Sequence, residues 1–476
     1  MLFNSIHFLL FFPIIVGIYF LLPFKHRWKL LLAGSYYFYM CWKIEYIILI
    51  LFSTIIDYYC SLKMDSKEHK RDKKKYLIIS LITNLGILFL FKYFNFFGET
   101  TNLILQKFNI FYNVPRFNLL LPVGISFYTF QTLSYSIDVY KGKQKAEKHF
   151  GIFALYVSFF PQLVAGPIER STHLLPQFKR ETKFEYNNVR RGLLLILAGL
   201  FKKVVIADNI SNYVDPVYNS VGLVQGFPLI LATLFFGIQI YCDFSGYSDI
   251  AIGVAKILGY DLMKNFNLPY FSKSIKEFWG RWHISLSTWF RDYVYLELGG
   301  NRTTTMLWIR NIAAVFILSG LWHGANLTFI VWGVLHFLFY LFSHFLKPIR
   351  QKSFNVFKKF TPMWLISFYR VLFTYISVHI AWVFFRANSL NDAIYIIKNM
   401  FPVTNFNLNT QSTAVFAVYC FLILILFIFM IIREKLDIIA FLDRCPLVVR
   451  WSFYLIAPLF IIIFQGSASN FIYFQF

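Results

Sequence analysis

Charged residues are scarce in this chain of 476 residues, and this scarcity excludes an ordinary soluble protein. Only 14% of the residues are charged, whereas 58% are hydrophobic and 21% are aromatic. A soluble domain carries about 25% charged residues, so this chain has too little polar surface to cover a globule in water. We therefore expect most of the chain to lie in lipid.

Cysteine motifs, linkers and internal repeats are also lacking. The five cysteines are scattered without C-x-x-C spacing, so the sequence predicts neither a disulfide framework nor a metal site. No Pro/Ser-rich linker and no repeat of fixed period divides the chain. We therefore expect a single membrane domain over 1–476, with the richest motifs at about 120–335.

Long apolar runs, in contrast, recur along the whole chain. Each is long enough to cross about 30 Å of hydrocarbon as a helix. We predict an all-α polytopic membrane protein with about eleven transmembrane helices, plus re-entrant or interfacial helices. The clearest runs cover residues 7–24, 76–97, 219–241, 364–386, 413–432 and 449–466.

The net charge of +23 does not indicate nucleic-acid binding, because Lys and Arg occur in short clusters between apolar runs. The positive-inside rule assigns such clusters to the cytoplasm and leaves both termini outside. The basic segment 166–191 does not fit, since counting crossings puts it outside, and we expect a re-entrant loop or a missed crossing there. The clusters expected in the cytoplasm are 25–29, 63–75, 141–148, 347–359 and 433–450.

A short amphipathic helix is predicted over 275–293. Ser274 and Glu277 have the spacing of a capping box at its start. The glycine pair at 299–300 predicts a stop and turn, because glycine tolerates positive φ. His283 lies between the apolar and polar stripes of this helix. It is either an interfacial histidine that caps or hydrogen-bonds a neighbour, or a catalytic residue.

A second histidine interrupts an apolar stretch over 308–345 that is long enough for two crossings. His323 lies in its middle, and an ionisable side chain at such depth is a functional candidate. Desolvating an imidazolium costs several kcal/mol and favours the neutral ring that a general base requires. Asn326 or Ser319 could fix its tautomer by a hydrogen bond. The alternative is a polar residue that joins two helices.

The other polar residues within apolar runs are weaker candidates. His336, His344 and His379 lack neighbouring Gly and amide groups, and we interpret them as packing or interfacial residues. Asp243 and Asp249 lie in YCDFSGYSD, which is typical either of a broken helix lining a polar cavity or of caps at a helix N-terminus.

The polar stretches fall in four sequence blocks, at 122–140, 159–178, 281–302 and 318–333. Together these blocks resemble the membrane-bound O-acyltransferase (MBOAT) family, and they are most similar to its alginate O-acetyltransferase branch. The resemblance implies an all-helical core whose helices enclose a funnel. It also implies that His323 matches the invariant histidine of the family and that His283 is the supporting histidine.

The resemblance further implies what the chain does. A member of this branch passes an acetyl group across the bacterial inner membrane from a cytoplasmic donor, acetyl-CoA or another acyl thioester, without a bound cofactor. The acceptor is an extracytoplasmic polysaccharide, such as alginate, peptidoglycan or another exopolysaccharide. The expected partners are membrane lipid and a separate extracytoplasmic acetyltransferase.

A mechanism can be assigned to these residues. His323 would take a proton from the acceptor hydroxyl group, or from an intermediary nucleophile, as it attacks the thioester carbonyl. His283, Asn326 or the indole of Trp322 would donate a hydrogen bond to the oxyanion. Cations at the cytoplasmic side would bind the phosphates of a CoA-type donor. The candidates for that role are Arg281, Arg291, Lys276 and Arg302.

Two other functions are compatible with the sequence. The first is D-alanyl transfer to teichoic acid, which another branch of the same family performs. The second is a transporter or flippase for lipid-linked sugars, which the number of apolar runs and the buried polar residues would also suit. Such transporters usually contain two related halves, and no such halves are evident here.

Overall fold

The computed structural model describes residues 1–110, 112, 114–117, 120–358, 360–401, 413–435, 438–467 and 471–472. Throughout these ranges every regular element is helical and no strand occurs. The predicted all-α class is therefore confirmed.

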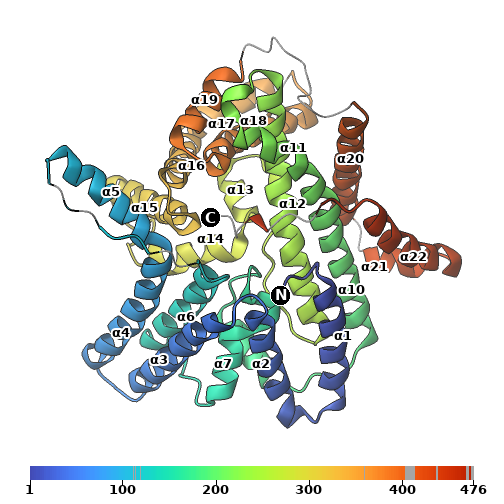
Figure 1. Cartoon of the computed structure of the whole chain (residues 1–476). Helices are drawn as coiled ribbons and strands as arrows, with labels where there is room; N and C mark the ends of the chain where they lie inside the picture. Colours follow the sequence, from blue (N-terminus) through green and yellow to red (C-terminus); the bar gives the residue numbers. More distant parts are fainter. Residues whose placement is uncertain are drawn as a thin grey trace. The chain divides into compact units, whose positions relative to one another are not determined.

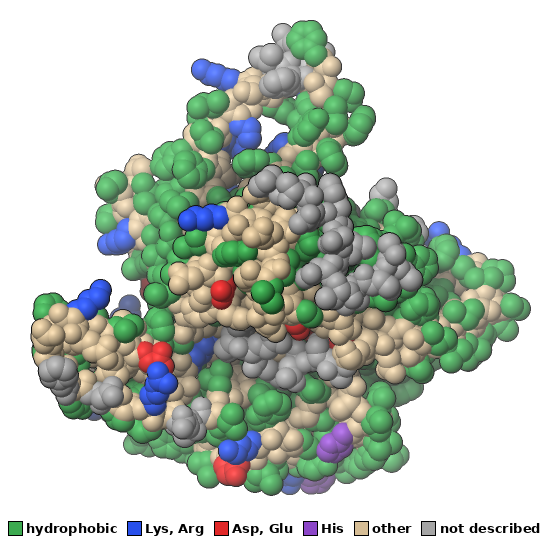
Figure 2. Space-filling view, turned by 45° about the horizontal axis from the view of Figure 1, so that its top comes forward, with side chains coloured by type: hydrophobic (Ala, Val, Ile, Leu, Met, Phe, Trp, Pro, Cys, Tyr) green, Lys and Arg blue, Asp and Glu red, His purple; other side chains and the backbone are tan. Residues whose placement is uncertain are grey.

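Spanning helices dominate the described ranges. Seven helices are long and apolar enough to cross a membrane, and two shorter apolar helices cover Ile6–Leu21 and Leu447–Ile463. Hydrophobic side chains cover much of the face visible in Figure 2. The chain is thus a multi-pass membrane protein. The seven helices cover Ile44–Asp65, Lys70–Lys107, Phe227–Ile257, Thr305–His323, Leu327–Phe345, Met363–Arg386 and Val415–Ile432.

The contacts group the chain into two compact units. Unit 1 comprises Met1–Leu195 and Ala251–Met263. Its helices α3, α4 and α6 pack side by side (Figure 1). The elements of unit 1 are α1 (Ile6–Leu21), α2 (Phe24–Met40), η1 (Ile44–Tyr46), α3 (Ile47–Asp65), α4 (Lys70–Leu88), η2 (Phe89–Tyr93), α5 (Phe94–Lys107), α6 (Ile125–Tyr140), α7 (Phe150–Ser158), α8 (Phe160–Leu163), α9 (Ser171–Phe178) and the first part of α10 (Tyr186–Leu200).

A buried carboxylate joins three helices of unit 1. Asp57 of α3 is fully buried and accepts hydrogen bonds from Ser80 Oγ (2.6 Å) and from Asn84 Nδ2 (2.9 Å) of α4. Thr132 of α6 donates in turn to Asn84 Oδ1 (3.2 Å). A buried charge is tolerated only when such partners satisfy it. This polar network therefore specifies how α3, α4 and α6 meet.

The segment 166–191, which the charge pattern left ambiguous, contains the short helix α9 and the start of α10, with mostly exposed residues between them. Its helix α9 has only eight residues and cannot cross a bilayer. Glu169, at 0% exposure, accepts a hydrogen bond from the backbone N–H of Met263 and pairs with His173 at 2.8 Å. The Glu169 hydrogen bond raises the pKa of His173. Within the described residues 166–185 no helix is long enough to cross a bilayer, so no missed crossing lies there.

Unit 2 comprises Ile196–Ile250 and Lys264–Phe476. Its helices α15 and α16 form an antiparallel pair, and α18 packs on α16 (Figure 1). Its elements are the end of α10, η3 (Phe201–Ala207), α11 (Asp208–Asn219), η4 (Val221–Leu223), most of α12 (Phe227–Ile257), η5 (Pro269–Phe271), α13 (Ile275–Arg281), α14 (Ile284–Phe290), η6 (Arg291–Tyr295), α15 (Thr305–His323), α16 (Leu327–Phe345), α17 (Lys347–Phe357), α18 (Met363–Arg386), α19 (Leu390–Asn399), α20 (Thr413–Lys435), α21 (Ile438–Arg444) and α22 (Leu447–Ile463).

Both sequence interpretations of Asp243 and Asp249 are wrong. The two residues lie inside the unbroken helix α12, so they neither border a helix break nor cap an N-terminus. Asp243 pairs with Lys203 at 2.8 Å, and Asp249 pairs with Lys202 at 2.8 Å. The countercharges come from the preceding helix, which the local sequence around the aspartates does not reveal. Paired in this way, carboxylates can be buried without interrupting the helix.

Glycines allow α15 and α16 to approach closely. A Cβ atom on Gly320 would overlap the carbonyl oxygen of Phe329, and one on Gly333 would overlap that of Phe316. Small residues at these positions permit backbone contact between membrane helices. The predicted division of the apolar stretch into two crossings is confirmed, since α15 ends at His323 and α16 begins at Leu327.

Candidate active site

The segment that carries His283 is a bent pair of short helices and not the single helix expected over 275–293. Helix α13 ends at Arg281 and α14 begins at Ile284. His283 lies between them in the left-handed conformation (φ 44°, ψ 54°), which is costly for a residue with a Cβ atom. The predicted cap at Ser274 is confirmed, because its Oγ accepts from the N–H of Glu277 at 3.2 Å.

Asn265 holds this bend in place. Its backbone carbonyl accepts from the N–H of Ile284 at 2.8 Å, and its side-chain Oδ1 accepts from the N–H and the Oγ of Ser285 at 3.3 and 2.9 Å. Its Nδ2 donates to Ser248 Oγ at 3.2 Å. A buried asparagine with this many bonds compensates the cost of the left-handed residue. Asn265 was not predicted from the sequence, because it lies 18 residues from His283.

The same asparagine fixes the tautomer of His283. Nδ1 of His283 lies 3.0 Å from Asn265 Oδ1. The backbone N–H of Ser285 can only donate, so the atom that it contacts must be the amide oxygen. An oxygen there accepts, and Nδ1 of His283 therefore carries the proton. Nε2 is then the acceptor nitrogen of a neutral ring.

Burial reinforces the neutral state of His283. The side chain has no exposed surface, and burial lowers its pKa to about 3. Phe244 lies edge-on to the imidazole at 4.6 Å, and Phe266 is nearly parallel to it at 6.4 Å, measured between ring centroids. His283 is therefore uncharged at neutral pH. The only N–H of this ring, at Nδ1, is bound to Asn265, and Nε2 can only accept. His283 therefore does not supply the hydrogen-bond donor that an oxyanion needs.

His323 is the last residue of α15, next to the turn into α16. The midpoint of the apolar stretch is therefore a turn between two apolar helices, and His323 adjoins this turn. Its ring is only 4% exposed. Trp332 and Phe385 lie edge-on to the imidazole at 5.1 and 5.2 Å. Protein aromatic rings therefore bury His323.

Trp322 connects the two histidines. Its ring lies 5.9 Å from that of His283 and 4.9 Å from that of His323. Trp322 is itself 4% exposed. Two imidazoles and one indole N–H are thus gathered in unit 2 within an aromatic environment. Such an arrangement suits a reaction that needs a base and a hydrogen-bond donor away from water.

The two other supporting candidates differ in their surroundings. Asn326 caps α16, since its Oδ1 accepts from the N–H of Thr328 at 3.0 Å, and its Nδ2 donates to the carbonyl of Asn388 at 3.2 Å. Its amide is therefore already engaged in starting α16. Ser319 lies one helical turn before His323 and is 4% exposed.

The four candidate cations for donor binding are not equivalent. Arg281 pairs with Glu277 of its own helix at 2.8 Å. Arg291 pairs with Asp292 at 2.8 Å. A partner within the same segment offsets much of the charge that a phosphate would meet. The remaining two, Lys276 and Arg302, have exposed side chains.

The remaining histidines agree with the packing interpretation. His336 is fully buried between Trp279 and Trp332, each 4.9 Å from its ring. His379 is 3% exposed and donates from Nδ1 to the carbonyl oxygen of Tyr375 at 2.8 Å. His344 is exposed and lies against Trp308 at 4.5 Å.

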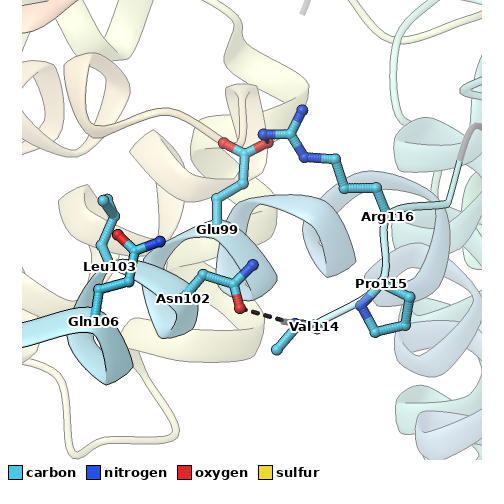
Figure 3. Close-up of a pocket in the computed structure, with 7 residues that line it drawn as sticks. All are labelled: Glu99, Asn102, Leu103, Gln106, Val114, Pro115 and Arg116. Carbon is cyan, nitrogen blue, oxygen red and sulfur yellow. Dashed lines mark hydrogen bonds and ion pairs between the residues drawn. The ribbon is translucent and has the colours of Figure 1, made fainter. Parts of the chain in front are cut away.

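Figure 3 shows a pocket of about 500 Å³ in unit 1, beside α5. Arg116 pairs there with Glu99 at 3.1 Å, and the N–H of Val114 donates to Asn102 at 2.8 Å. None of the candidate site residues lines it. Among the described residues, no three His, Cys, Asp or Glu side chains are grouped so that they could hold a metal ion.

Comparison with known proteins gives a consistent result. Residues 36–385 match the family model described as MBOAT, membrane-bound O-acyltransferase family. The chain is 38% identical to a probable alginate O-acetylase AlgI of Azotobacter vinelandii, over 87% of this chain and 81% of that protein. It is 36% identical to a peptidoglycan O-acetyltransferase of Helicobacter pylori, over 78% and 73%.

A more partial similarity links the chain to another branch. A teichoic acid D-alanyltransferase of Bacillus subtilis is 34% identical, over 47% of this chain and 58% of that protein. The match to the O-acetylating relatives thus extends over a much larger share of the chain.

We predict that Asn265→Ala destabilises the protein strongly. The change leaves the two donors of Ser285 and Nδ1–H of His283 buried without their acceptor, at about 1–3 kcal/mol each. The matched control is Asn267→Ala, because Asn267 is exposed and its side-chain Oδ1 accepts from Lys264 Nζ. Thermal unfolding in detergent should show a much lower melting temperature for the first variant alone. Equal melting temperatures would contradict the role of Asn265 in holding the bend at His283.

Proposed function

Because the chain belongs to the membrane-bound O-acyltransferase family, and is therefore an O-acyltransferase, we propose that it passes acetyl groups across the membrane for O-acetylation of an extracytoplasmic polysaccharide. The observation that carries this proposal is that two buried imidazoles lie near one indole: the ring of Trp322 is 5.9 Å from that of His283 and 4.9 Å from that of His323. The relatives with the most extensive matches, which are named as O-acetylases of alginate or peptidoglycan, support the acetyl group as cargo.

His323 is the general base of the proposed reaction. It takes the proton of the acceptor hydroxyl as that oxygen bonds to the carbonyl carbon of the acyl thioester. The C–S bond then breaks, and the departing thiolate receives the proton from the imidazolium, so that the ring returns to its neutral state. Such proton transfer contributes about 10²–10⁴-fold to rates. The aromatic rings around His323 exclude water, which would otherwise hydrolyse the thioester.

Trp322 is the best candidate for stabilising the oxyanion. An oxyanion needs a donor, and the tautomer of His283 presents an acceptor at Nε2. The amide of Asn326 already donates to Asn388. The indole N–H of Trp322 can only donate, and its ring lies against both imidazoles. His283 then acts as the neutral neighbour that orients Trp322 and the reacting hydroxyl.

The proposed donor is acetyl-CoA, taken from the cytoplasm. Basic clusters mark the cytoplasmic side of membrane proteins, and the candidate cations Arg281, Arg291, Lys276 and Arg302 follow α12 in a basic stretch. Lys276 and Arg302 are exposed and suit the phosphates of CoA best. By the positive-inside rule, both termini are proposed to be extracytoplasmic. The proposed location of the protein is the bacterial inner membrane.

Transfer to the sugar is proposed to be completed by a separate acetyltransferase outside the membrane. The proposed acceptor class is an alginate-like polymer, peptidoglycan or another exopolysaccharide, which the names of the relatives support. D-alanyl transfer is the second candidate, and the partial match to the Bacillus subtilis protein favours it. The share of the chain covered by each match ranks acetyl transfer first.

We predict that His323→Ala abolishes acetylation of the polysaccharide while the protein remains inserted and folded. His283→Ala should reduce acetylation less. The measurement is the O-acetyl content of the extracellular polysaccharide in cells that produce each variant at equal level. His344→Ala, which removes an exposed histidine, is the control and should have no effect. Normal acetyl content in the His323→Ala strain would refute the proposed base, and a larger loss from His283→Ala would reverse the two roles.

We predict that Trp322→Phe lowers kcat by about 10²–10³-fold, because it removes one oxyanion donor and keeps an aromatic ring. KM for the donor should change little, since the ground-state carbonyl needs that hydrogen bond less. Trp308→Phe, at the distant contact with His344, is the control. A raised KM with normal kcat would assign Trp322 to substrate binding instead.

The donor can be tested directly with purified protein in vesicles. Labelled acetyl-CoA on one side should give labelled polysaccharide or labelled partner enzyme on the other, and the His323→Ala protein should give none. A D-alanyl thioester of a carrier protein should not replace acetyl-CoA. Transport of a lipid-linked sugar without any acetyl transfer would favour the flippase and contradict the proposal.

A further inference from the structure

A large groove lies in unit 2, away from the two histidines. It has a volume of about 1010 Å³ and is bordered by α16, α17, α18 and the start of α13. Its walls are mainly apolar, with Phe342 and Phe373 on two of the spanning helices and Ile349 on α17. Both α16 and α18 are long and apolar enough to cross a membrane. The apolar walls are therefore suited to hydrocarbon.

Three cationic side chains also line this groove. Lys273, Arg350 and Arg370 line it, and no Asp or Glu does. None of the three makes an ion pair with an acidic side chain in the described part of the chain. Burial, together with the nearby charge of Arg370, lowers the pKa of Arg350. Two guanidinium groups thus lie near each other without a carboxylate to offset them.

A groove that has apolar walls and cationic side chains without a neutralising carboxylate is suited to bind an anionic amphiphile. An apolar ligand alone would leave the repulsion between Arg350 and Arg370 in place, whereas a phosphate would relieve it through charge-assisted hydrogen bonds. The basic segment 347–359 is expected on the cytoplasmic side, where membranes carry their anionic lipids. Basic pockets between membrane helices on that side bind phospholipid headgroups.

We propose that this groove binds one anionic phospholipid molecule, with its phosphate at Arg350 and Arg370 and its acyl chains along the phenylalanine walls. Ser274 and Ile275 also line the groove, and they begin α13, which leads to the turn at His283. A bound lipid therefore holds the start of the helix that carries the supporting histidine. The binding itself does not depend on the proposed acetyl transfer.

The test is native mass spectrometry of the full chain, purified in a non-ionic detergent and stripped of lipid. Phosphatidylglycerol and phosphatidylcholine with the same acyl chains are added in equal amounts. We expect one phosphatidylglycerol to bind preferentially. Arg350→Gln combined with Arg370→Gln should weaken its binding by about 25-fold, a factor of about five for each lost cation. The preference for phosphatidylglycerol should disappear with it.

Two matched variants make the result specific. Arg350→Lys combined with Arg370→Lys keeps both charges and should retain the preference for phosphatidylglycerol. Lys352→Gln removes an exposed cation from the same helix outside the groove, and binding should change less than twofold. Elution as a single species in size-exclusion chromatography confirms that each variant is folded.

Three results would overturn the proposal. The first is equal binding of both lipids by the unmodified protein, which would mean an apolar surface without headgroup recognition. The second is undiminished binding by the double glutamine variant. The third is displacement of the lipid by acetyl-CoA, which would assign the groove to the acyl donor. None of these depends on measuring acetyl transfer, so the lipid site and the enzymatic activity can fail separately.

Discussion

In a chain surrounded by hydrocarbon, every buried polar group must find its partner within the protein, and this constraint organises both units. Asp57 meets hydroxyl and amide donors of α4, and Thr132 of α6 donates to the same Asn84. Lys203 meets Asp243 within unit 2. At the candidate site, Asn265 meets the donors of Ser285 and His283. Each network fixes one way in which the helices can pack, because any other packing would leave charges or donors unpaired.

The candidate active site applies the same constraint to catalysis. The supporting imidazole must be neutral and correctly oriented, and the hydrogen bond that His283 donates to Asn265, together with complete burial, achieves both. Glycines between α15 and α16 bring His323 into an aromatic enclosure. The site therefore combines ionisable rings with an environment that excludes water, which suits the proposed acyl transfer. This geometry requires His283 to adopt a strained left-handed backbone conformation at the bend. Such strain is typical of functional sites.

Local features of the structure could be read from the sequence, whereas pairings could not. The capping side chain of Ser274, the division of the apolar stretch into α15 and α16, and the positive φ of the glycine pair 299–300 were predicted correctly. The bend at His283 was missed, because a helical pattern continues through it and only the distant Asn265 breaks it. Asp243 was misread for a similar reason, since its partner Lys203 belongs to another helix.

The sequence by itself determined that this protein is all-helical, crosses the membrane many times and resembles the O-acyltransferases of membranes. These properties follow from composition, from apolar runs and from contiguous motifs, all of which are local along the chain. Only the tertiary structure decided that His283 and His323 share the indole of Trp322 and that His283 is protonated at Nδ1. Those facts depend on side chains from separate elements, and hydrogen bonds between them form only after the helices have packed.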